Sequence, residues 1–386
     1  MRHNGTVASC AAAILALGLA VPLGAQDHDP GTSIQRGLAY LRTTQNPDGS
    51  WSPQVGPAIT GLVLTGLLND PGIGPSDPAA ARAIASILSK ARPDGGIHEG
   101  FLPNYNTAIC LSALSEVKDR PDVDRVREKA ISFLRDLQWQ PGMTGAHDDP
   151  ITKRHPFYGG AGYGKHGRPD LSNTHIMLQG LHDAGVPADD PAYQRAIVFI
   201  HRLQGVASNE LHGRRIVQDG GFIYATSVNK DLVGVPQSMA SPEQLDEANQ
   251  GRPVSGLRTY GSMTYAGFKS YLYANLARDD HRVQAALGWI RANYTLGQNP
   301  GMPEPLRHQG LYYYFITFAR ALDAWGEDTI KTPDGTEHRW RDDLVQQLVA
   351  LQRPDGSWVN EADRWMEGDP NLVTAYSVIA LQIATK

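Results

Sequence analysis

Cysteine is almost absent from this chain of 386 residues, which contains only Cys10 and Cys110. Cys10 lies in an apolar N-terminal run that we expect to be removed, so one cysteine remains in the folded protein. A single cysteine forms neither an intrachain disulfide nor a thiolate metal cluster. Cys110 lies among apolar residues at helical spacing, which predicts a small buried side chain.

The chain also has no excess of basic charge. It contains 35 Lys and Arg residues and 40 Asp and Glu residues, which give a formal net charge of -5. The chain therefore lacks the basic patch with which proteins attract nucleic acid, and we expect no nucleic-acid partner. Hydrophobic residues make up 41% and charged residues 19%. This balance allows a large core and argues against disorder.

Long apolar runs are missing apart from the one that spans 7–23, which follows Arg2 and His3. The small residues that end this run form an acceptable cleavage site. The pattern predicts a signal peptide at 1–25 and one domain at 26–386, exported to the periplasm or the cell exterior, with no stable membrane span after cleavage. Retention of the run as an uncleaved membrane anchor is the alternative.

Several catalytic motifs are missing as well. The sequence has no GxSxG nucleophile elbow, no phosphate-cradling P-loop and no HExxH helix. Histidines and aspartates gather at 147–155, but without the spacing of metal ligands on a helix. We therefore expect no metal site and no cofactor.

A repeat is the strongest feature that is present. Gln45, Gly49 and Trp51 follow one another at the spacing Gln-x3-Gly-x-Trp, and the same spacing returns at 352–358. Self-similarity near both ends of a chain predicts a repeat architecture.

The repeating unit combines an amphipathic helix, a glycine-rich turn and a helix that is apolar nearly all round. In the apolar helices a threonine precedes an apolar residue by seven positions, which are two helical turns, so both lie on one face. These pairs are Thr60 with Leu67, Thr107 with Leu114, Thr174 with Leu181, Thr264 with Tyr271 and Thr374 with Leu381, and Phe315 replaces threonine in a further segment. Helices of this kind are buried.

No segment alternates convincingly with period two, so we predict an all-α fold of six helical hairpins. The first and last units carry the strongest copies of the motif, which predicts that they meet and close the hairpins into a barrel around a central cavity. Long inserts at 142–171 and 225–263 should lie over one mouth of this cavity, because long loops in a compact domain are usually functional or mobile.

The spacing of Arg36, Tyr40, Gln45, Gly49 and Trp51 resembles the complete QW motif of squalene and hopene cyclases. The first halves of two more copies lie at 129–138 and 195–204, and a degenerate copy retains its glutamine, glycine and tryptophan at 352–358. The resemblance covers about residues 31 to 384. It implies the α/α-toroid fold of those cyclases and of protein prenyltransferase β-subunits, in a secreted member with a single toroid.

The catalytic motifs of these families are not found. The sequence has no DxDD, the motif whose middle Asp protonates an alkene in the cyclases. The cysteine that binds zinc in protein prenyltransferases has no counterpart in a comparable place, and their Lys- and Arg-rich diphosphate site is not evident. No catalytic residue therefore carries over from the resemblance, and whether the protein is an enzyme stays open.

The segment 157–175 is the first candidate site. It holds Tyr158 and Tyr163, then Asp170, Asn173 and His175 at the start of a buried helix. A helix N-terminus at a cavity mouth suits anionic groups, and Asp170 is a candidate acid or base. The alternative is that Asp170 or its neighbour Ser172 caps the helix.

The segments 258–265 and 308–314 are the second candidate. They supply Tyr260, Tyr265, Tyr312 and Tyr313, and His308 lies one helical turn before Tyr312 as a second catalytic candidate. Aromatic side chains in a cavity stabilise cations and stack on sugars. Ordinary core packing is the alternative.

Three functions fit these features. The first is binding or transformation of a small apolar, isoprenoid-type molecule in the central cavity. The second is a glycosidase or polysaccharide lyase. Such an enzyme needs a pair of carboxylates set by distance, or a base with a charge-neutralising partner. Asp170, Glu99 and Asp369 are conceivable for this role but are not paired along the sequence. The third is a noncatalytic scaffold outside the cytoplasm. The lining of the cavity discriminates among them, because the fold does not.

Overall fold

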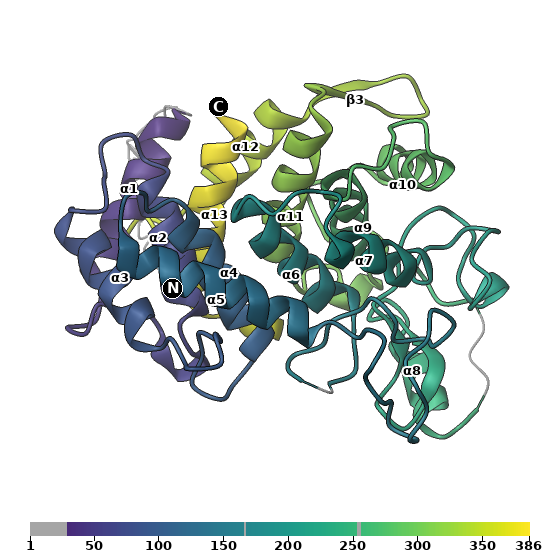
Figure 1. Ribbon diagram of the computed structural model, residues 1–386. Coiled ribbons are helices and arrows are strands. Elements are labelled where there is room, and N and C mark those ends of the chain that lie inside the picture. Colours follow the sequence, from purple (N-terminus) through teal and green to yellow (C-terminus); the bar gives the residue numbers. More distant parts are fainter. Residues whose placement is uncertain (1–28, 166, 253–255) are drawn as a thin grey trace, which may run out of the picture.

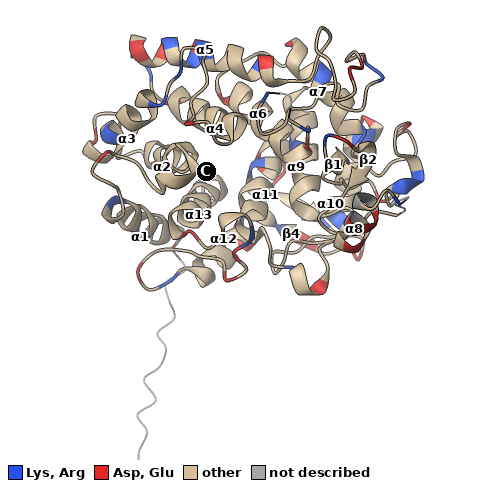
Figure 2. Ribbon diagram, turned by 90° about the horizontal axis from the view of Figure 1, so that it is seen from below, with Lys and Arg blue, Asp and Glu red and all other residues tan. Residues whose placement is uncertain are grey.

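The computed structural model describes residues 29–165, 167–252 and 256–386. The predicted signal peptide lies outside these residues. Within them, twelve α-helices form two concentric rings (Figures 1 and 2). The inner ring contains α2 (Ala58–Leu68), α4 (Pro103–Ser115), α6 (Leu171–Asp183), α9 (Gly261–Tyr273), α11 (Leu311–Trp325) and α13 (Pro370–Ala384). The outer ring contains α1 (Pro30–Thr43), α3 (Pro78–Ser89), α5 (Pro121–Leu137), α7 (Pro191–His201), α10 (His281–Ala292) and α12 (Trp340–Leu351).

Each inner helix contacts the next one around the ring, and α13 contacts α2, so the ring is closed. The prediction of six hairpins closed into an α/α-toroid is therefore confirmed. Lys, Arg, Asp and Glu gather on the outer helices and connections, whereas the inner helices carry few charges (Figure 2). Cys110 is buried in α4 as expected. None of the helices in the described part of the chain combines the length and the apolar character that crossing a bilayer requires.

The glycine turns between outer and inner helices are held by the residues of the repeat. Gly49 and Gly356 have φ angles of 83° and 88°, which favour glycine, and a Cβ atom on either would lie 2.3 or 2.5 Å from a backbone oxygen of the next outer helix. In four of the turns a preceding glutamine donates to the carbonyl oxygen of a turn glycine and to a carbonyl oxygen of the following outer helix, as Gln45 does to Gly49 and Ala79.

The same contacts close the ring. Gln352 donates to the oxygen of Gly356 at 2.9 Å and to that of Ser33, in the first helix, also at 2.9 Å. The five predicted threonines lock the turns from the inner side, because each hydroxyl accepts the backbone N–H of the residue after the turn. These pairs are Thr60 with Trp51, Thr107 with Ile97, Thr174 with Ala161, Thr264 with Phe222 and Thr374 with Trp358.

Asp-Pro pairs begin four of the helices. The aspartate accepts a backbone N–H of the first turn, and proline tolerates the first helical position because that N–H has no partner in the helix. The pairs are Asp29 with Pro30, Asp77 with Pro78, Asp190 with Pro191 and Asp369 with Pro370. Each pair therefore fixes the residue at which its helix begins.

The described residues also contain structure that the sequence did not predict. β1 (Ala225–Ser227) pairs antiparallel with β2 (Val233–Gln237), and β3 (Thr329–Lys331) with β4 (Glu337–Arg339). These strands are too short to show alternation along the sequence. The helix α8 (Pro242–Asn249) follows β2, and the 3-10 helices are η1 (Pro53–Val55), η2 (Gly213–Arg215), η3 (Glu304–Leu306) and η4 (Arg364–Met366). The sheet β1–β2 belongs to the second insert.

Candidate functional site

A cavity of about 350 Å³ lies at the end of the toroid where the inner helices begin. Apart from Ser172, Ser262 and Glu367, its described lining is aliphatic, aromatic, methionine or glycine. The lining residues are Val55, Ala58, Ile59, Leu62, Leu102, Tyr105, Ile109, Tyr163, Ser172, Tyr224, Met239, Tyr260, Ser262, Met263, Gly310, Tyr313, Trp365, Met366, Glu367, Leu372 and Tyr376. This is the deep aromatic and aliphatic pocket that an apolar ligand needs.

Both long inserts contribute to this wall, as predicted. Tyr163 comes from the first insert and Met239 from the second. The inserts are also tied to each other, because the Arg168 guanidinium donates to the Ser227 oxygen at 2.9 Å and to the Gln237 side chain.

The cavity wall carries strained backbone. Leu102, Trp365 and Met366 have φ angles of 42°, 56° and 70°, a region that side-chain-bearing residues rarely adopt. Such strain persists only where the surrounding structure holds it, and it gathers at ligand sites. In this chain it places the Trp365 ring, which is 44% exposed, beside the cavity.

Glu367 is the one carboxylate among the described lining residues, and it was not predicted. Its side chain is 1% exposed, and it accepts hydrogen bonds from the Tyr313 backbone at 2.7 Å and from the Asn360 side chain at 2.6 Å. Burial raises its pKa to about 7, against the opposing effect of these hydrogen bonds. A carboxyl with this pKa is poised to exchange a proton at neutral pH.

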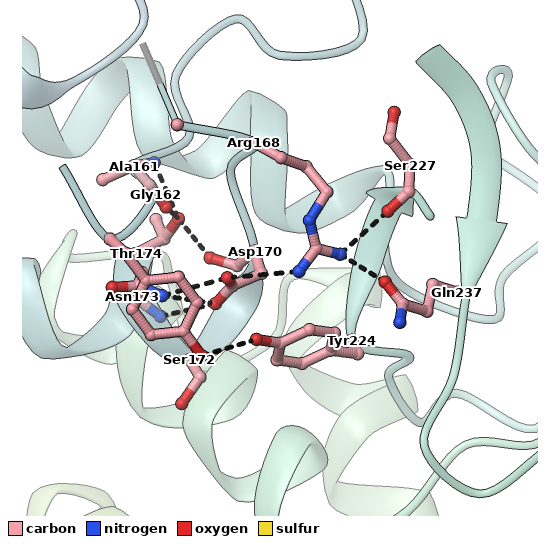
Figure 3. Close-up of polar contacts among 12 residues, drawn as sticks. Ala161, Gly162, Arg168, Asp170, Ser172, Asn173, Thr174, Tyr224, Ser227 and Gln237 are labelled. Atoms are coloured by element: carbon pink, nitrogen blue, oxygen red, sulfur yellow. Dashed lines mark hydrogen bonds and ion pairs between the residues drawn. The ribbon is translucent and has the colours of Figure 1, made fainter. Parts of the chain in front are cut away.

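Asp170 stands two residues before the lining residue Ser172 and caps α6, with Arg168 and Asn173 beside its carboxylate (Figure 3). It is fully buried, accepts the Asn173 backbone N–H at 2.8 Å and side-chain N–H at 2.9 Å, and lies 3.9 Å from the Arg168 guanidinium. Burial raises its pKa, opposed by the charge of Arg168 and by the hydrogen bonds from Asn173 and Tyr224. The geometry supports the capping alternative, and an acid or base role stays a prediction.

Substitution of Asp170 distinguishes these roles. If Asp170 acts as a helix cap, the substitution Asp170→Ala is expected to lower the free energy of unfolding by about 1–2 kcal/mol. Asp170→Asn, which keeps an acceptor for the Asn173 N–H, is expected to cost less and to leave ligand binding intact. Denaturant unfolding and a binding titration measure both. Full loss of ligand binding in a folded Asp170→Asn protein would contradict a purely structural role.

Four of the predicted residues lie in the cavity wall or in a hydrogen-bonded chain that reaches it through Tyr313. Tyr163, Tyr260 and Tyr313 line the cavity. The Tyr313 hydroxyl bonds to Ser172 at 2.8 Å and to His175 Nε2 at 2.5 Å, and Ser172 also bonds to Tyr105. Burial lowers the pKa of His175 well below its usual value, so the imidazole is neutral.

The other predicted residues lie elsewhere. His308 is exposed and precedes α11, and its backbone oxygen accepts from Asn360. Tyr158 packs on the small cluster of Trp139, Ile151 and Phe157 in the first insert. Tyr265 and Tyr312 are buried in the core against other aromatic rings. None of these four lines the cavity described above.

The carboxylates named for sugar chemistry are also apart. Glu99 pairs with Lys90 at 2.7 Å on the surface, and Asp369 caps α13. Neither lines the cavity, so Glu367 has no facing carboxylate in the described part of the wall. The described residues likewise hold no group of three or more His, Cys, Asp or Glu side chains placed to bind a metal ion.

Three solved structures match more than nine-tenths of the chain. A D-mannose isomerase matches with a TM-score of 0.55 at 12% identity, over 94% of this chain and 99% of that one. The GH76A α-1,6-mannanase of Salegentibacter sp. HEL1_6 matches with a TM-score of 0.55 at 11% identity, over 92% of this chain and 100% of the mannanase chain. The chain has the α/α-toroid fold. The type II terpene cyclase MstE from Scytonema matches with a TM-score of 0.47 at 14% identity, over 92% of this chain and 97% of the cyclase chain.

No protein-family model matches the sequence, and no curated protein matches it either. At these identities the structural likeness extends to the fold of the toroid alone. The residues that line its cavity therefore decide what the toroid does.

Proposed function

We propose that this toroid binds an apolar, isoprenoid-type molecule in its central cavity. The observation that carries the proposal is the lining, in which aliphatic and aromatic side chains surround about 350 Å³ and Glu367 is the one charged group described. Burial of an apolar ligand against such a wall gains about 25 cal/mol for each Å² removed from water. Tyrosine and tryptophan rings would add stacking or cation contacts.

The proposal includes export of the protein, with 1–25 as its signal peptide, and a place in the secreted branch of the QW-repeat proteins. If the protein also transforms its ligand, Glu367 is the residue best placed to supply a proton, because it is a lining residue of the cavity and burial raises its pKa to about 7. The carbohydrate alternative has a weaker basis. The mannanase and the mannose isomerase share the fold, but a facing carboxylate is not found in the described cavity wall.

Ligand binding is tested with farnesol and, for the alternative, with α-1,6-mannotriose. Farnesol is expected to stabilise the protein by about 2.7 kcal/mol at one hundred times its Kd, seen as a rise in Tm. Native mass spectrometry of protein purified from its own host would show whether a lipid is retained. Stabilisation by the sugar and not by farnesol, or by neither, would contradict the proposal.

A filled cavity should lose this binding. Ala58 lies in the cavity wall at the start of α2, so Ala58→Trp is expected to weaken farnesol binding about tenfold or more by occupying its space. Ala85→Trp makes the same change at an exposed position of the outer helix α3 and is the matched control. A fluorescence or calorimetric titration compares the two, and equal affinities would place the ligand outside the cavity.

A further inference from the structure

A small chamber lies deeper in the toroid, below the cavity. It measures about 30 Å³, which is room for about one or two water-sized groups. The chamber and the cavity share four wall residues, Leu62, Ile109, Tyr313 and Tyr376. The end of a chain that fills the cavity would therefore meet the chamber across these side chains.

Lys269 lies in this chamber wall, on the inner helix α9, and is 1% exposed. Its amine donates to the Gln179 side-chain oxygen at 2.5 Å and lies 5.4 Å from the centre of the Tyr273 ring. It forms no ion pair with any described carboxylate. The nearest acid in the hydrogen-bond chain is Asp183, which accepts from the Gln179 amide at 2.6 Å.

The surroundings favour the neutral amine. Burial lowers the pKa of Lys269 well below its usual value, and the charge of Arg320, which also lines the chamber, lowers it further, opposed by Asp183. Neutral buried lysines are nucleophiles towards carbonyl carbon.

His175 adds a polar group to the same chamber. Its Nε2 bonds to the Tyr313 hydroxyl, whereas its Nδ1 is buried and has no hydrogen-bond partner among the described residues. In the tautomer in which Nε2 accepts the Tyr313 proton, neutral His175 carries its own proton on Nδ1. A buried N–H without an acceptor costs free energy that an incoming oxygen would recover.

We propose that Lys269 forms a Schiff base with the carbonyl carbon of an apolar, isoprenoid-type aldehyde or ketone. This inference rests on the proposed function, because the hydrocarbon chain would lie in the cavity and place only its carbonyl in the chamber. The carbonyl must pass Tyr313, whose ring has to turn and release Ser172 and His175.

The chemistry balances without another reactant. The Lys269 nitrogen adds its electron pair to the carbonyl carbon as the C=O π bond breaks, and a proton passes from nitrogen to oxygen. The C–O bond of this carbinolamine then breaks as the second proton of the nitrogen passes to the departing oxygen, which leaves as water, and the nitrogen lone pair forms the C=N bond. His175 is placed to hydrogen-bond the oxygen, and Asp183, through Gln179, is the nearest balancing charge for a protonated imine.

Reductive trapping tests the inference. The full-length protein is incubated with farnesal and sodium cyanoborohydride, which reduces the C=N bond, and the adduct is located by peptide mass spectrometry. We expect one farnesyl group per chain, on Lys269, in excess of any other lysine by about tenfold or more. Exposed lysines such as Lys165 and Lys331 are internal controls. Lys269→Met should abolish the specific adduct.

Farnesol separates the two hypotheses, because it has the same chain and no carbonyl. If farnesol binds in the cavity and Lys269 stays unmodified, the Schiff base is wrong and the proposed function stands. If labelling merely follows lysine exposure, the Schiff base is equally overturned. If neither farnesol nor farnesal binds, the proposed function and the Schiff base are both wrong. Mapping in the wild-type protein decides the matter even if Lys269→Met does not fold.

Discussion

Trp358→Ala is expected to lower the free energy of unfolding by about 3–5 kcal/mol. The Trp358 ring is fully buried, and its Nε1 donates to the Leu348 oxygen at 2.8 Å in the outer helix just ended. The ring also meets the first helix, because a Cβ atom on Gly37 would lie 2.9 Å from it. The substitution therefore leaves a void where the last hairpin joins the first.

Chemical denaturation measures this loss, and Trp365→Ala is the matched control. Trp365 is 44% exposed at the cavity, so its removal should change stability far less and should instead weaken binding of an apolar ligand. Comparable destabilisation by the two substitutions would contradict the role assigned to the repeat tryptophan. A Trp358→Ala protein as stable as the wild type would show that ring closure does not depend on this contact.

Glu367→Gln is expected to remove a pH dependence of stability of about 3 kcal/mol. Burial raises the pKa of Glu367 from 4.5 to about 7 in the folded protein, so the folded state binds this proton more tightly than the unfolded state. The stabilisation is fully present below pH 4.5 and is lost as the pH rises to about 7. The wild type should therefore lose stability across this window relative to the variant.

Urea unfolding at several pH values between 4 and 8 checks this result. Glutamine keeps an oxygen for the Tyr313 N–H, so the helix start is preserved. Glu361→Gln is the matched control, because Glu361 is exposed in the same loop and its substitution should leave the pH dependence unchanged. Parallel stability curves for wild type and Glu367→Gln would mean that folding does not change the pKa of Glu367.

The candidate site was predicted in part. Tyr163 lines the cavity from within the first insert, and Tyr260 and Tyr313 line it from the starts of inner helices, which the repeat makes visible. Tyr265 and Tyr312 stand in the same segments but point into the core, since neighbouring residues on a helix face different directions.

Other cavity residues gave no signal in the sequence. Tyr105 and Tyr376 lie inside apolar helices, where an aromatic residue predicts only burial, and Trp365 depends on a left-handed turn of η4. Glu367 is an ordinary acid in a polar loop when read along the chain. Its raised pKa arises from side chains that other repeats bring around it, which is a property of the assembled ring.

By itself the sequence determined the architecture. Glutamine, glycine and tryptophan at fixed spacing, with threonine in the following helix, specify the first and last turns through local hydrogen bonds, and their recurrence at both ends specifies a closed ring. The tertiary structure alone decided the cavity, because its walls come from six hairpins and two inserts far apart in the chain. Desolvation of Glu367 and Lys269, and hence their chemistry, exists only after those segments have packed together.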